Sequence, residues 1–289
     1  MRLLVTGAAG MLAGDLLRAA ERAGHETVGL ARAELDIRDA DDVARAVAGA
    51  EPDAVVNCAA WTDVDGAESA REDAFAVNAA GAGNLARAAA AVGTALLHVS
   101  SDYVFSGEAR LDADGRPRPY VESDDTAPRS VYGQSKLAGE REVLAASPRH
   151  LVVRSSWLFG VDGPNFVETM LRLGGERASV EVVDDQVGCP TWTGHLAAAL
   201  IGLLEREVSG LVHQAGGGQV SWNGFAREIF RQAGVDCEVL PSTTEQMGRP
   251  APRPAYSAIV SEREDVLPMP PWQDGLAGHL AARAGIIRS

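Results

Sequence analysis

Apolar residues gather in short continuous runs along the first half of the chain, and each run leads into small or polar residues. These runs cover residues 2–6, 27–30, 54–57, 95–100 and 150–154. Helical patterns lie between them, over residues 11–23, 41–50 and 69–92 and from residue 131 onward. A continuous apolar run is typical of a strand buried on both faces, and its alternation with helices is typical of βαβ units. The pattern therefore predicts an α/β fold with a Rossmann-type doubly wound parallel sheet.

The pattern becomes less regular after Arg154. Helical stretches are predicted at residues 166–173, 193–205 and 222–233, and the prolines between Pro241 and Tyr256 indicate an ordered loop. We expect residues 1–154 to form the Rossmann domain, to which parts of about 178–212 and 255–265 return. Residues 155–289 are expected to form mostly a smaller C-terminal lobe, built from discontinuous segments.

Composition narrows the range of partners. The chain has 289 residues, 46% of them hydrophobic, and a formal net charge of −14. A surface this acidic repels phosphate groups, so we expect neither nucleic acid nor an anionic membrane as a partner. No stretch approaches the roughly 20 apolar residues of a membrane span, and the N-terminus does not resemble a signal peptide. Cys58, Cys189 and Cys237 are widely spaced and odd in number, which favours reduced thiols and a cytoplasmic location.

A glycine-rich turn separates the first predicted strand from the first predicted helix. Gly7 allows a tight turn, Gly10 lets the backbone approach a pyrophosphate, and the small Ala13 lets helix and strand pack closely. The helix N-terminus then offers free N–H groups to phosphate. This arrangement indicates a dinucleotide-binding site, and an ordinary strand-to-helix turn is the alternative. Residues 1–154 are therefore the expected NAD(P)-binding domain.

The end of the second predicted strand bears on the choice of nucleotide. Arg32 follows that strand, where an acidic residue would bind the ribose hydroxyls and disfavour a 2′-phosphate. An arginine there favours NADPH, with NADH as the alternative. Asp36 and Ile37, slightly further along the chain, are candidates for holding the adenine edge.

Tyr132 and Lys136 are four residues apart on a predicted helix, so their side chains share one face. An ammonium beside a phenol favours the phenolate, and we expect Lys136 to lower the pKa of Tyr132 towards neutrality. A tyrosine tuned in this way exchanges a proton with a substrate oxygen. The fourth predicted strand leads to Ser101, at the sheet edge where doubly wound proteins bind their ligands. Ser101, Tyr132 and Lys136 thus form a candidate set for polarising and protonating a carbonyl beside a nicotinamide.

Together these motifs resemble the extended short-chain dehydrogenase/reductase superfamily, and within it the dTDP-4-dehydrorhamnose reductase family. The segments that carry the resemblance are residues 35–37, 52–68, 77–78, 101–107, 132–140, 154–160, 165–167, 185–191 and 253–257. They span most of the chain, and they are specific jointly rather than singly. Ala13 departs from the family's usual third glycine, and Tyr256 and Ala258 depart from its last motif, which leaves the details of nucleotide contact open.

The residue patterns and the resemblance together give three candidate sets. Catalysis is assigned to Ser101, Tyr132 and Lys136. The expected cofactor contacts are Gly7, Gly10, Met11, Leu12, Arg32, Asp36, Ile37, Ala59, Ala60, Trp61, Thr62, Asn78 and Val99, together with Tyr132 and Lys136. The expected substrate contacts are Ser101, Asp102, Tyr103, Trp157, Asn165 and Arg253. Asn165 and Arg253 are the candidates for the diphosphate, because that group needs cationic or N–H partners.

The resemblance implies the NADPH-dependent reduction of dTDP-4-dehydro-β-L-rhamnose to dTDP-L-rhamnose, by an oxidoreductase of nucleotide-sugar biosynthesis. One alternative is a reductase of another dTDP-4-keto-6-deoxysugar, such as an enzyme similar to dihydrostreptose synthase. A second is a non-catalytic NADP-binding regulatory subunit. A third is an epimerase or dehydratase of the same superfamily. The sequence is also compatible with a homodimer.

The histidines and cysteines lack metal-ligand spacing, so no metal site is expected from them. Asp63, Asp65 and Glu68 form a small acidic cluster. We expect a solvated acidic turn there, and an Mg²⁺ ion at a subunit interface is the alternative.

Overall fold

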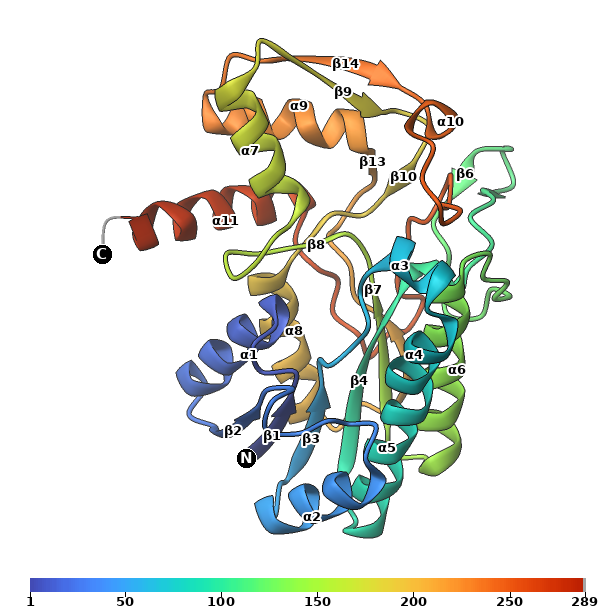
Figure 1. Ribbon diagram of the computed structural model, residues 1–289, viewed down its shortest axis with the longest axis vertical. Coiled ribbons are helices and arrows are strands. Elements are labelled where there is room, and N and C mark those ends of the chain that lie inside the picture. The colour runs from blue at the N-terminus through green and yellow to red at the C-terminus, as the bar shows by residue number, and fades with distance from the viewer. Residues whose placement is uncertain (288–289) are drawn as a thin grey trace.

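The computed structural model describes residues 1–287 and is built around a six-stranded parallel sheet (Figure 1). The strands are β1 (Arg2–Thr6), β2 (Glu26–Leu30), β3 (Ala54–Asn57), β4 (Ala95–Ser101), β7 (Leu151–Ser155) and β12 (Gly210–His213). Their spatial order is β12-β7-β4-β3-β1-β2, and every neighbouring pair is parallel. Strand β2 lies on one side of β1, and β3, the next strand along the chain, lies on the other side. The strand order therefore reverses between β1 and β3, which is the topological switch point of the sheet. The predicted doubly wound sheet is confirmed.

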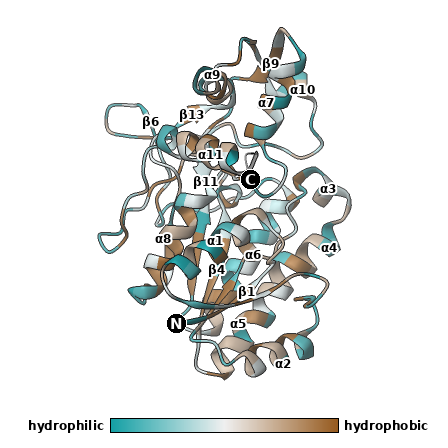
Figure 2. Cartoon of the chain, turned by 90° about the vertical axis from the view of Figure 1, so that its left-hand side faces the viewer, coloured by the Kyte–Doolittle hydropathy of each residue, from teal (hydrophilic) through white to brown (hydrophobic). Residues whose placement is uncertain are grey.

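Helices cover both faces of this sheet (Figure 1). One face carries α1 (Met11–Arg22) and α8 (Thr193–Glu205), and the other carries α2 (Ala40–Ala50), α5 (Ala82–Ala91) and α6 (Val131–Ala146). The side chains of β1 alternate between the two helix layers. Leu3 and Val5 pack in the core with α1 and α8, whereas Leu4 packs in the core with α2 and α5. Figure 2 shows hydrophobic residues concentrated along the sheet. A continuous apolar run is what a strand between two helix layers requires.

A smaller lobe lies beyond the carboxyl ends of the strands (Figure 1). Strand β9 (Ser179–Val183) pairs in parallel with β14 (Glu238–Ser242), and α7 (Phe166–Glu176) and α9 (Trp222–Ala233) pack against the pair. Helix α11 (Trp272–Ile287) packs against α8, α9 and the short strand at residues 191–192. The core of the lobe includes Phe159, Val182, Phe225, Phe230 and Trp272. The division of the chain into two domains at residue 154 stays a prediction.

Short elements complete the fold. They are α3 (Val64–Ser69), α4 (Arg71–Phe75), α10 (Thr244–Met247), β5 (Arg110–Leu111), β6 (Pro117–Arg118), β8 (Leu158–Phe159), β10 (Val187–Gly188), β11 (Thr191–Trp192) and β13 (Val220–Ser221). Within the described part of the chain, no helix combines the length and the apolar character that crossing a membrane requires.

The long helix predicted over residues 69–92 is confirmed as a helical run from Arg71 to Ala91, in which α4, a π-helical turn and α5 follow one another without a break. Ala70 adopts a non-helical conformation between α3 and α4, and a π-helical turn, Ala76–Gly81, precedes α5. The turn carries the buried Asn78, whose side-chain oxygen accepts from the Trp61 backbone N–H at 2.9 Å. Alanine-rich sequence favours helix locally, and sequence pattern alone does not show the change to π-helical geometry within it.

The loop predicted over Pro241–Tyr256 is wrong in its first part. Pro241 lies inside β14, and α10 follows at Thr244–Met247. Strand β14 pairs with β9 alone, and an edge strand tolerates a proline because one side of it donates no ladder hydrogen bonds.

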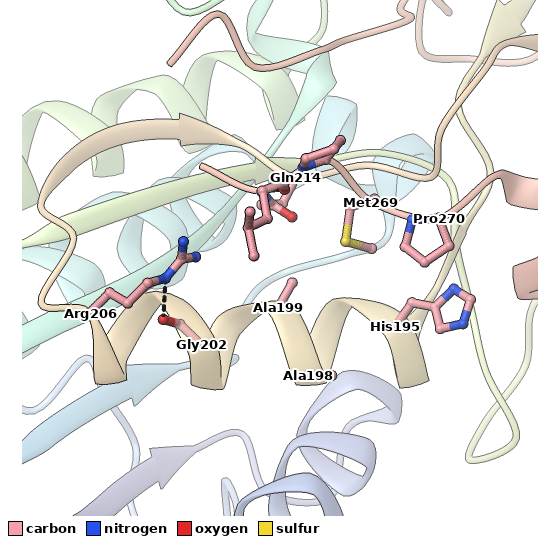
Figure 3. Close-up of a pocket in the computed structure, with 10 residues that line it drawn as sticks. His195, Ala198, Ala199, Gly202, Arg206, Gln214, Met269 and Pro270 are labelled. Carbon is pink, nitrogen blue, oxygen red and sulfur yellow. Dashed lines mark hydrogen bonds between the residues drawn. The ribbon is translucent and has the colours of Figure 1, made fainter. Parts of the chain in front are cut away.

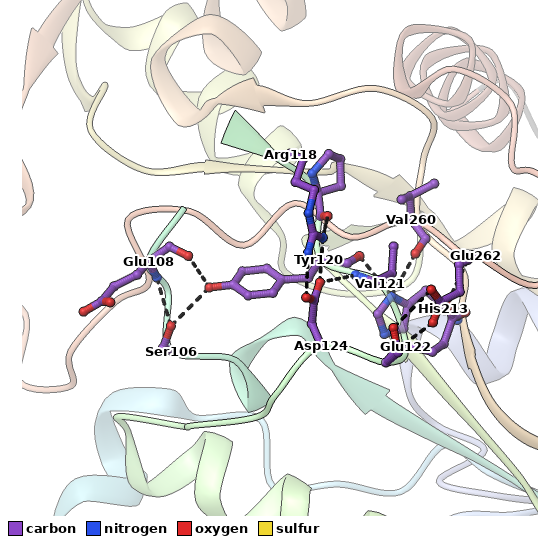
Figure 4. A network of polar contacts seen from close by, with 12 residues as sticks. Ser106, Glu108, Arg118, Tyr120, Val121, Glu122, Asp124, His213, Val260 and Glu262 are labelled. Atoms are coloured by element: carbon purple, nitrogen blue, oxygen red, sulfur yellow. Dashed lines mark hydrogen bonds and ion pairs between the residues drawn. The ribbon is translucent and has the colours of Figure 1, made fainter. Parts of the chain in front are cut away.

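The segment after residue 255 returns to the end of the main sheet (Figure 4). The Tyr120 N–H donates to the Ala258 carbonyl at 2.8 Å, and the Val260 N–H donates to the Tyr120 carbonyl at 2.9 Å. The Glu122 carboxylate accepts from the His213 N–H and from the Ser261 hydroxyl. These bonds join the loop before α6, strand β12 and the late segment around the carboxyl edge of the sheet.

Candidate active site

Helix α6 carries Tyr132 in its first turn and Lys136 in its second. The Ser130 hydroxyl accepts from the Gly133 N–H at 3.1 Å and caps the helix. A Cβ at Gly133 would lie 2.2 Å from the Tyr103 carbonyl oxygen, so a glycine is needed for α6 to approach the turn after β4. This close approach brings Tyr132 next to the end of β4.

Ser101 ends β4 and lies beside the Tyr132 phenol, where its hydroxyl acts to lower the pKa of the phenol. The Ser101 hydroxyl donates to the Asp102 carboxylate at 3.0 Å and accepts from the Tyr103 N–H at 3.2 Å. The Lys136 ammonium donates to the Val99 carbonyl at 2.7 Å. The three residues predicted to be catalytic are therefore gathered at the carboxyl end of β4.

Burial dominates the ionisation of this group. It raises the pKa of Tyr132 to about 12, and the hydrogen bond with Ser101 offsets only part of the rise. Burial also lowers the pKa of Lys136 to about 8. The expectation that Lys136 lowers the pKa of Tyr132 towards neutrality is wrong for this structure, because the ammonium is bonded to the Val99 carbonyl and desolvation of the phenol is the larger effect. Tyr132 thus carries its proton at neutral pH.

The glycine turn has the shape of a phosphate cradle. Gly7 has a φ of +71°, and a Cβ there would lie 2.7 Å from the Ala59 backbone nitrogen. The Gly10 N–H donates to the Gly7 carbonyl at 2.8 Å, immediately before α1. No described side chain caps the N-terminus of α1, so its first N–H groups can receive an anion. Met11 is half-buried beside this turn, whereas Leu12 packs into the core.

The residues expected at the adenosine end lie beyond the carboxyl end of β2. Arg32 is exposed, and Ile37 is buried. Asp36 pairs with Arg38 at 2.5 Å, and this hydrogen bond lowers the pKa of Asp36 to about 2. Sequence reasoning did not single out Arg38, although an arginine two residues after the candidate Asp36 was a signal for it.

A buried amide connects the loop after β3 to the catalytic helix. Asn78 accepts from the Trp61 N–H at 2.9 Å and donates to the Ser135 hydroxyl at 2.9 Å. Ser135 in turn donates to the Tyr132 carbonyl at 2.8 Å. Residues 59–61 of this loop are half-buried and Thr62 is exposed. Asn78 itself is buried, so it contributes to the site indirectly, by linking Trp61 to α6.

Two of the residues expected at the sugar, Asp102 and Tyr103, lie beside Tyr132, whereas Trp157 lies against Trp222 of the smaller lobe. Burial raises the pKa of Asp102 to about 6, and the ring of Tyr103 meets that of Tyr132 edge-on with centroids 5.4 Å apart. Trp157 has a φ of +47°, and its indole stacks on Trp222 with centroids 3.6 Å apart. A non-glycine residue with positive φ stores strain, which is common at functional sites.

The two candidates for the diphosphate differ in their contacts. The Asn165 amide donates to the Gly160 carbonyl at 2.7 Å and accepts from the Glu168 N–H at 3.1 Å, so it shapes the start of α7. Arg253 donates through Nη2 to Asp65 at 3.0 Å, while its buried Nη1 has no partner among the described residues. Arg253 is therefore the better placed of the two for an anion.

The acidic cluster is neither a simple solvated turn nor a group of converging ligands. Asp63 accepts from the Gly66 N–H, Asp65 pairs with Arg253, and Glu68 accepts from the Val131 N–H at 2.8 Å. Among the residues that the structure describes, no three histidine, cysteine, aspartate or glutamate side chains are grouped as metal ligands.

A cavity of about 270 Å³ lies away from this site, between α8 and residues 267–270 (Figure 3). His195, Arg206, Gln214 and Met269 are among the residues that line it. None of the candidate catalytic, cofactor or substrate residues lines this cavity, so we do not assign it to the reaction.

The glycine turn after β1 and the Ser–Tyr–Lys group at the end of β4 are the features of a Rossmann-type reductase. The family model for the RmlD substrate binding domain matches residues 1–284. The chain belongs to this family, that of the dTDP-4-dehydrorhamnose reductases.

Named relatives of this chain support the family assignment. The chain is 46% identical to a dTDP-4-dehydrorhamnose reductase of Mycobacterium tuberculosis, over 98% of this chain and 93% of that protein. It is 44% identical to a dTDP-4-dehydrorhamnose reductase of Streptomyces griseus, over 98% and 94% respectively. A solved dTDP-4-dehydrorhamnose reductase of Bacillus anthracis, in complex with NADP, matches with a TM-score of 0.92 and 37% identity over 97% of this chain and 99% of that chain.

Proposed function

We propose that this protein reduces dTDP-4-dehydro-β-L-rhamnose to dTDP-L-rhamnose with NADPH. The observation that carries the proposal is the meeting of Ser101, Tyr132 and Lys136 at the end of β4, beside a glycine turn suited to a dinucleotide, in a chain of this family. NADPH is proposed because the Bacillus anthracis relative holds NADP and because Arg32 stands where a 2′-phosphate would need a cation. A cytoplasmic location and a homodimer stay predictions from the sequence.

The cofactor, when bound, supplies a hydride to the C4 carbonyl carbon of the sugar. The Tyr132 phenol donates its proton to the oxygen that becomes the C4 hydroxyl, which its raised pKa permits at neutral pH. The Ser101 hydroxyl positions the Tyr132 phenol and the reacting carbonyl oxygen relative to each other. Lys136 holds the nicotinamide ribose through its ammonium, which burial leaves with a pKa of about 8. The site can therefore deliver a proton without first generating a phenolate.

The remaining predicted contacts complete the proposal. Gly7, Gly10 and the N-terminus of α1 receive the pyrophosphate of the cofactor. Trp157 and Tyr103 bound the sugar, and Arg253 binds the diphosphate of the substrate. For Asn165 to contact the substrate, its side chain must exchange the three hydrogen bonds that it makes to backbone groups.

Consumption of NADPH tests the proposal, followed through the absorbance of the reduced nicotinamide. The substrate is dTDP-4-keto-6-deoxyglucose, supplied with and without a 3,5-epimerase that converts it to the rhamnose precursor. Turnover that requires the epimerase supports the proposed substrate. Turnover without it indicates a reductase of another deoxysugar. No turnover in either mixture, with NADPH still bound, indicates a regulatory subunit and contradicts the proposal.

A further inference from the structure

The short helix α3 touches two segments that are far from it in the sequence. Asp65 accepts through Oδ1 from the Ala251 N–H at 3.1 Å and through Oδ2 from the Arg253 Nη2 at 3.0 Å. Glu68, one turn later, accepts from the N–H of Val131, the first residue of the catalytic helix. Helix α3 thus connects the segment that carries Arg253 to the start of α6.

Arg253 is bonded through one nitrogen of its guanidinium and has no hydrogen-bond partner among the described residues at another. Its side chain is 16% exposed, and Nη1 is buried without a hydrogen-bond partner among the described residues. Burial raises the pKa of the Tyr103 phenol; Arg253 opposes this rise, and Asp65 adds slightly to it. The arginine and its carboxylate partner therefore lie next to a residue of the candidate sugar site.

The neighbouring backbone belongs to the same arrangement. A narrow hollow is lined by Tyr103, Ser106, Arg129, Pro252 and Pro254, so the prolines on either side of Arg253 border the surface that also includes Tyr103. Prolines restrict the backbone on both sides of the arginine. The Asp65 bond to the Ala251 N–H then fixes this segment two residues before the guanidinium.

We propose that Asp65 is a positioning residue, which holds Arg253 beside Tyr103 so that the unpaired Nη1 of the guanidinium donates to the diphosphate of the nucleotide-sugar. This inference rests on the proposed function for its ligand. Arginine presents its donors in a rigid fork, so a carboxylate on one edge leaves the other edge correctly oriented for phosphate. An arginine that is already held loses less side-chain freedom when the ligand arrives.

Asp65 has a second effect of opposite sign, and the competition between the two makes the inference testable. Asp65 also neutralises part of the charge of Arg253, so its removal would strengthen phosphate binding if charge mattered more than orientation. Arg249, 3.6 Å from the same carboxylate, adds a second cation to the pair. We expect orientation to dominate because Asp65 makes two separate bonds to the segment and leaves Nη1 unpaired.

The experiment measures binding of dTDP and of NADPH by titration calorimetry on the full chain. The variants are Asp65→Asn, Arg253→Ala and the double variant, with Asp63→Asn as the matched control because Asp63 only caps α3. We expect Asp65→Asn to weaken dTDP binding about tenfold, while NADPH affinity stays within about twofold. The Asp65→Asn change should have no further effect in the Arg253→Ala background, since Asp65 acts through Arg253. Asp63→Asn should leave both affinities unchanged.

Several outcomes would overturn the inference. They are unchanged or tighter dTDP binding in Asp65→Asn, the same loss in the Arg253→Ala background, or an equal loss of NADPH affinity, which would mean a general structural defect. Arg253→Lys serves as a second variant, because it keeps the charge but loses the fork, and it should also weaken dTDP binding. If the wild type binds dTDP and the variants behave as expected, yet no keto-sugar is reduced, the proposed function fails and the positioning role of Asp65 stands.

Discussion

Tyr132 keeps its proton at neutral pH because burial raises its pKa to about 12, and Ser101 offsets only part of this rise. A reductase needs that proton, because the alkoxide formed by hydride addition must be protonated. Spacing alone predicted that Tyr132 and Lys136 share a helix face. It could not predict the direction of the pKa shift, because that depends on which carbonyl the ammonium meets and on how much water is excluded.

Replacing Tyr132 by phenylalanine tests the role of the proton donor. We expect Tyr132→Phe to lower kcat about 100- to 10,000-fold, since a positioned general acid contributes that much. The ring and its edge contact with Tyr103 are retained, so NADPH affinity should stay within about twofold. Steady-state rates and fluorescence titration with NADPH measure the two effects. A loss of NADPH binding as large as the loss of turnover would indicate a structural role instead.

Lys136 predicts an upper pH limit to cofactor use. Burial lowers its pKa to about 8, so the ammonium is present below that pH and is lost above it. Because the proposed mechanism uses the ammonium at the ribose, kcat/KM for NADPH should fall about tenfold for each pH unit above roughly pH 8. Rates at limiting NADPH between about pH 7 and pH 10 measure this. Lys136→Arg stays charged throughout and should be less active but without this decline; the same decline in that variant would assign it to another group.

At the scale of the elements, local pattern was most informative where a segment is buried by its immediate neighbours. Helices α8 and α9 and strands β1 and β3 have the predicted bounds. Strands β9 and β14 were missed because they lack the continuous buried run of β1 and β3: exposed and buried positions mix along both, and β14 contains Pro241. The C-terminal helix α11 was missed as well, although Trp272 and Leu276 belong to the core of the lobe. Sequence pattern does not say which distant partner completes a short element.

Gly133 sets the distance between α6 and the end of β4. A Cβ there would lie 2.2 Å from the Tyr103 carbonyl oxygen, so Gly133→Ala should force the helix outward and cost about 1–3 kcal/mol of unfolding free energy. Turnover should fall as well, since the same shift separates Tyr132 from Ser101. Urea unfolding and steady-state rates measure both effects.

Gly49→Ala is the matched control. Gly49 lies in the last turn of α2, and an added Cβ would meet nothing within 4 Å. Alanine has the higher helix propensity, so this variant should gain about 0.5–1 kcal/mol and keep full activity. Equal effects of the two substitutions would mean that propensity, rather than the approach of α6 to β4, decides the result.

At the scale of the whole molecule, the site depends on contacts between parts that sequence pattern treats separately. Arg253 and Asp65 are 188 residues apart. The candidates Ser101, Tyr132 and Lys136 could be found because each sits in a recognisable local motif. The pairing of Arg253 with Asp65 could not be predicted, because the local sequence around each residue does not identify the other as its partner. The expected solvated turn was wrong for the same reason.

A buried ion pair beneath the site joins the sheet to the catalytic helix. Arg154, near the end of β7, donates to Glu140 of α6 at 2.9 and 2.7 Å, and both side chains are at most 4% exposed. The Ser100 hydroxyl of β4 donates to the same carboxylate at 2.5 Å. The charge pair therefore links β7 to β4 and α6, the two elements that carry the candidate catalytic residues, and the packing of α6 depends on it.

Removing one partner of this pair should be far more costly than removing a surface pair. Arg154→Met leaves the Glu140 carboxylate buried without its cation, which should cost about 3–5 kcal/mol of unfolding free energy. Arg172→Met removes the exposed pair with Glu176, whose side chains are 60% and 54% exposed, and should cost less than about 0.5 kcal/mol. Urea unfolding of both variants gives the comparison. Similar costs would show that the Glu140 carboxylate is protonated or hydrated with little loss of free energy, and that the pair does not hold α6 against the sheet.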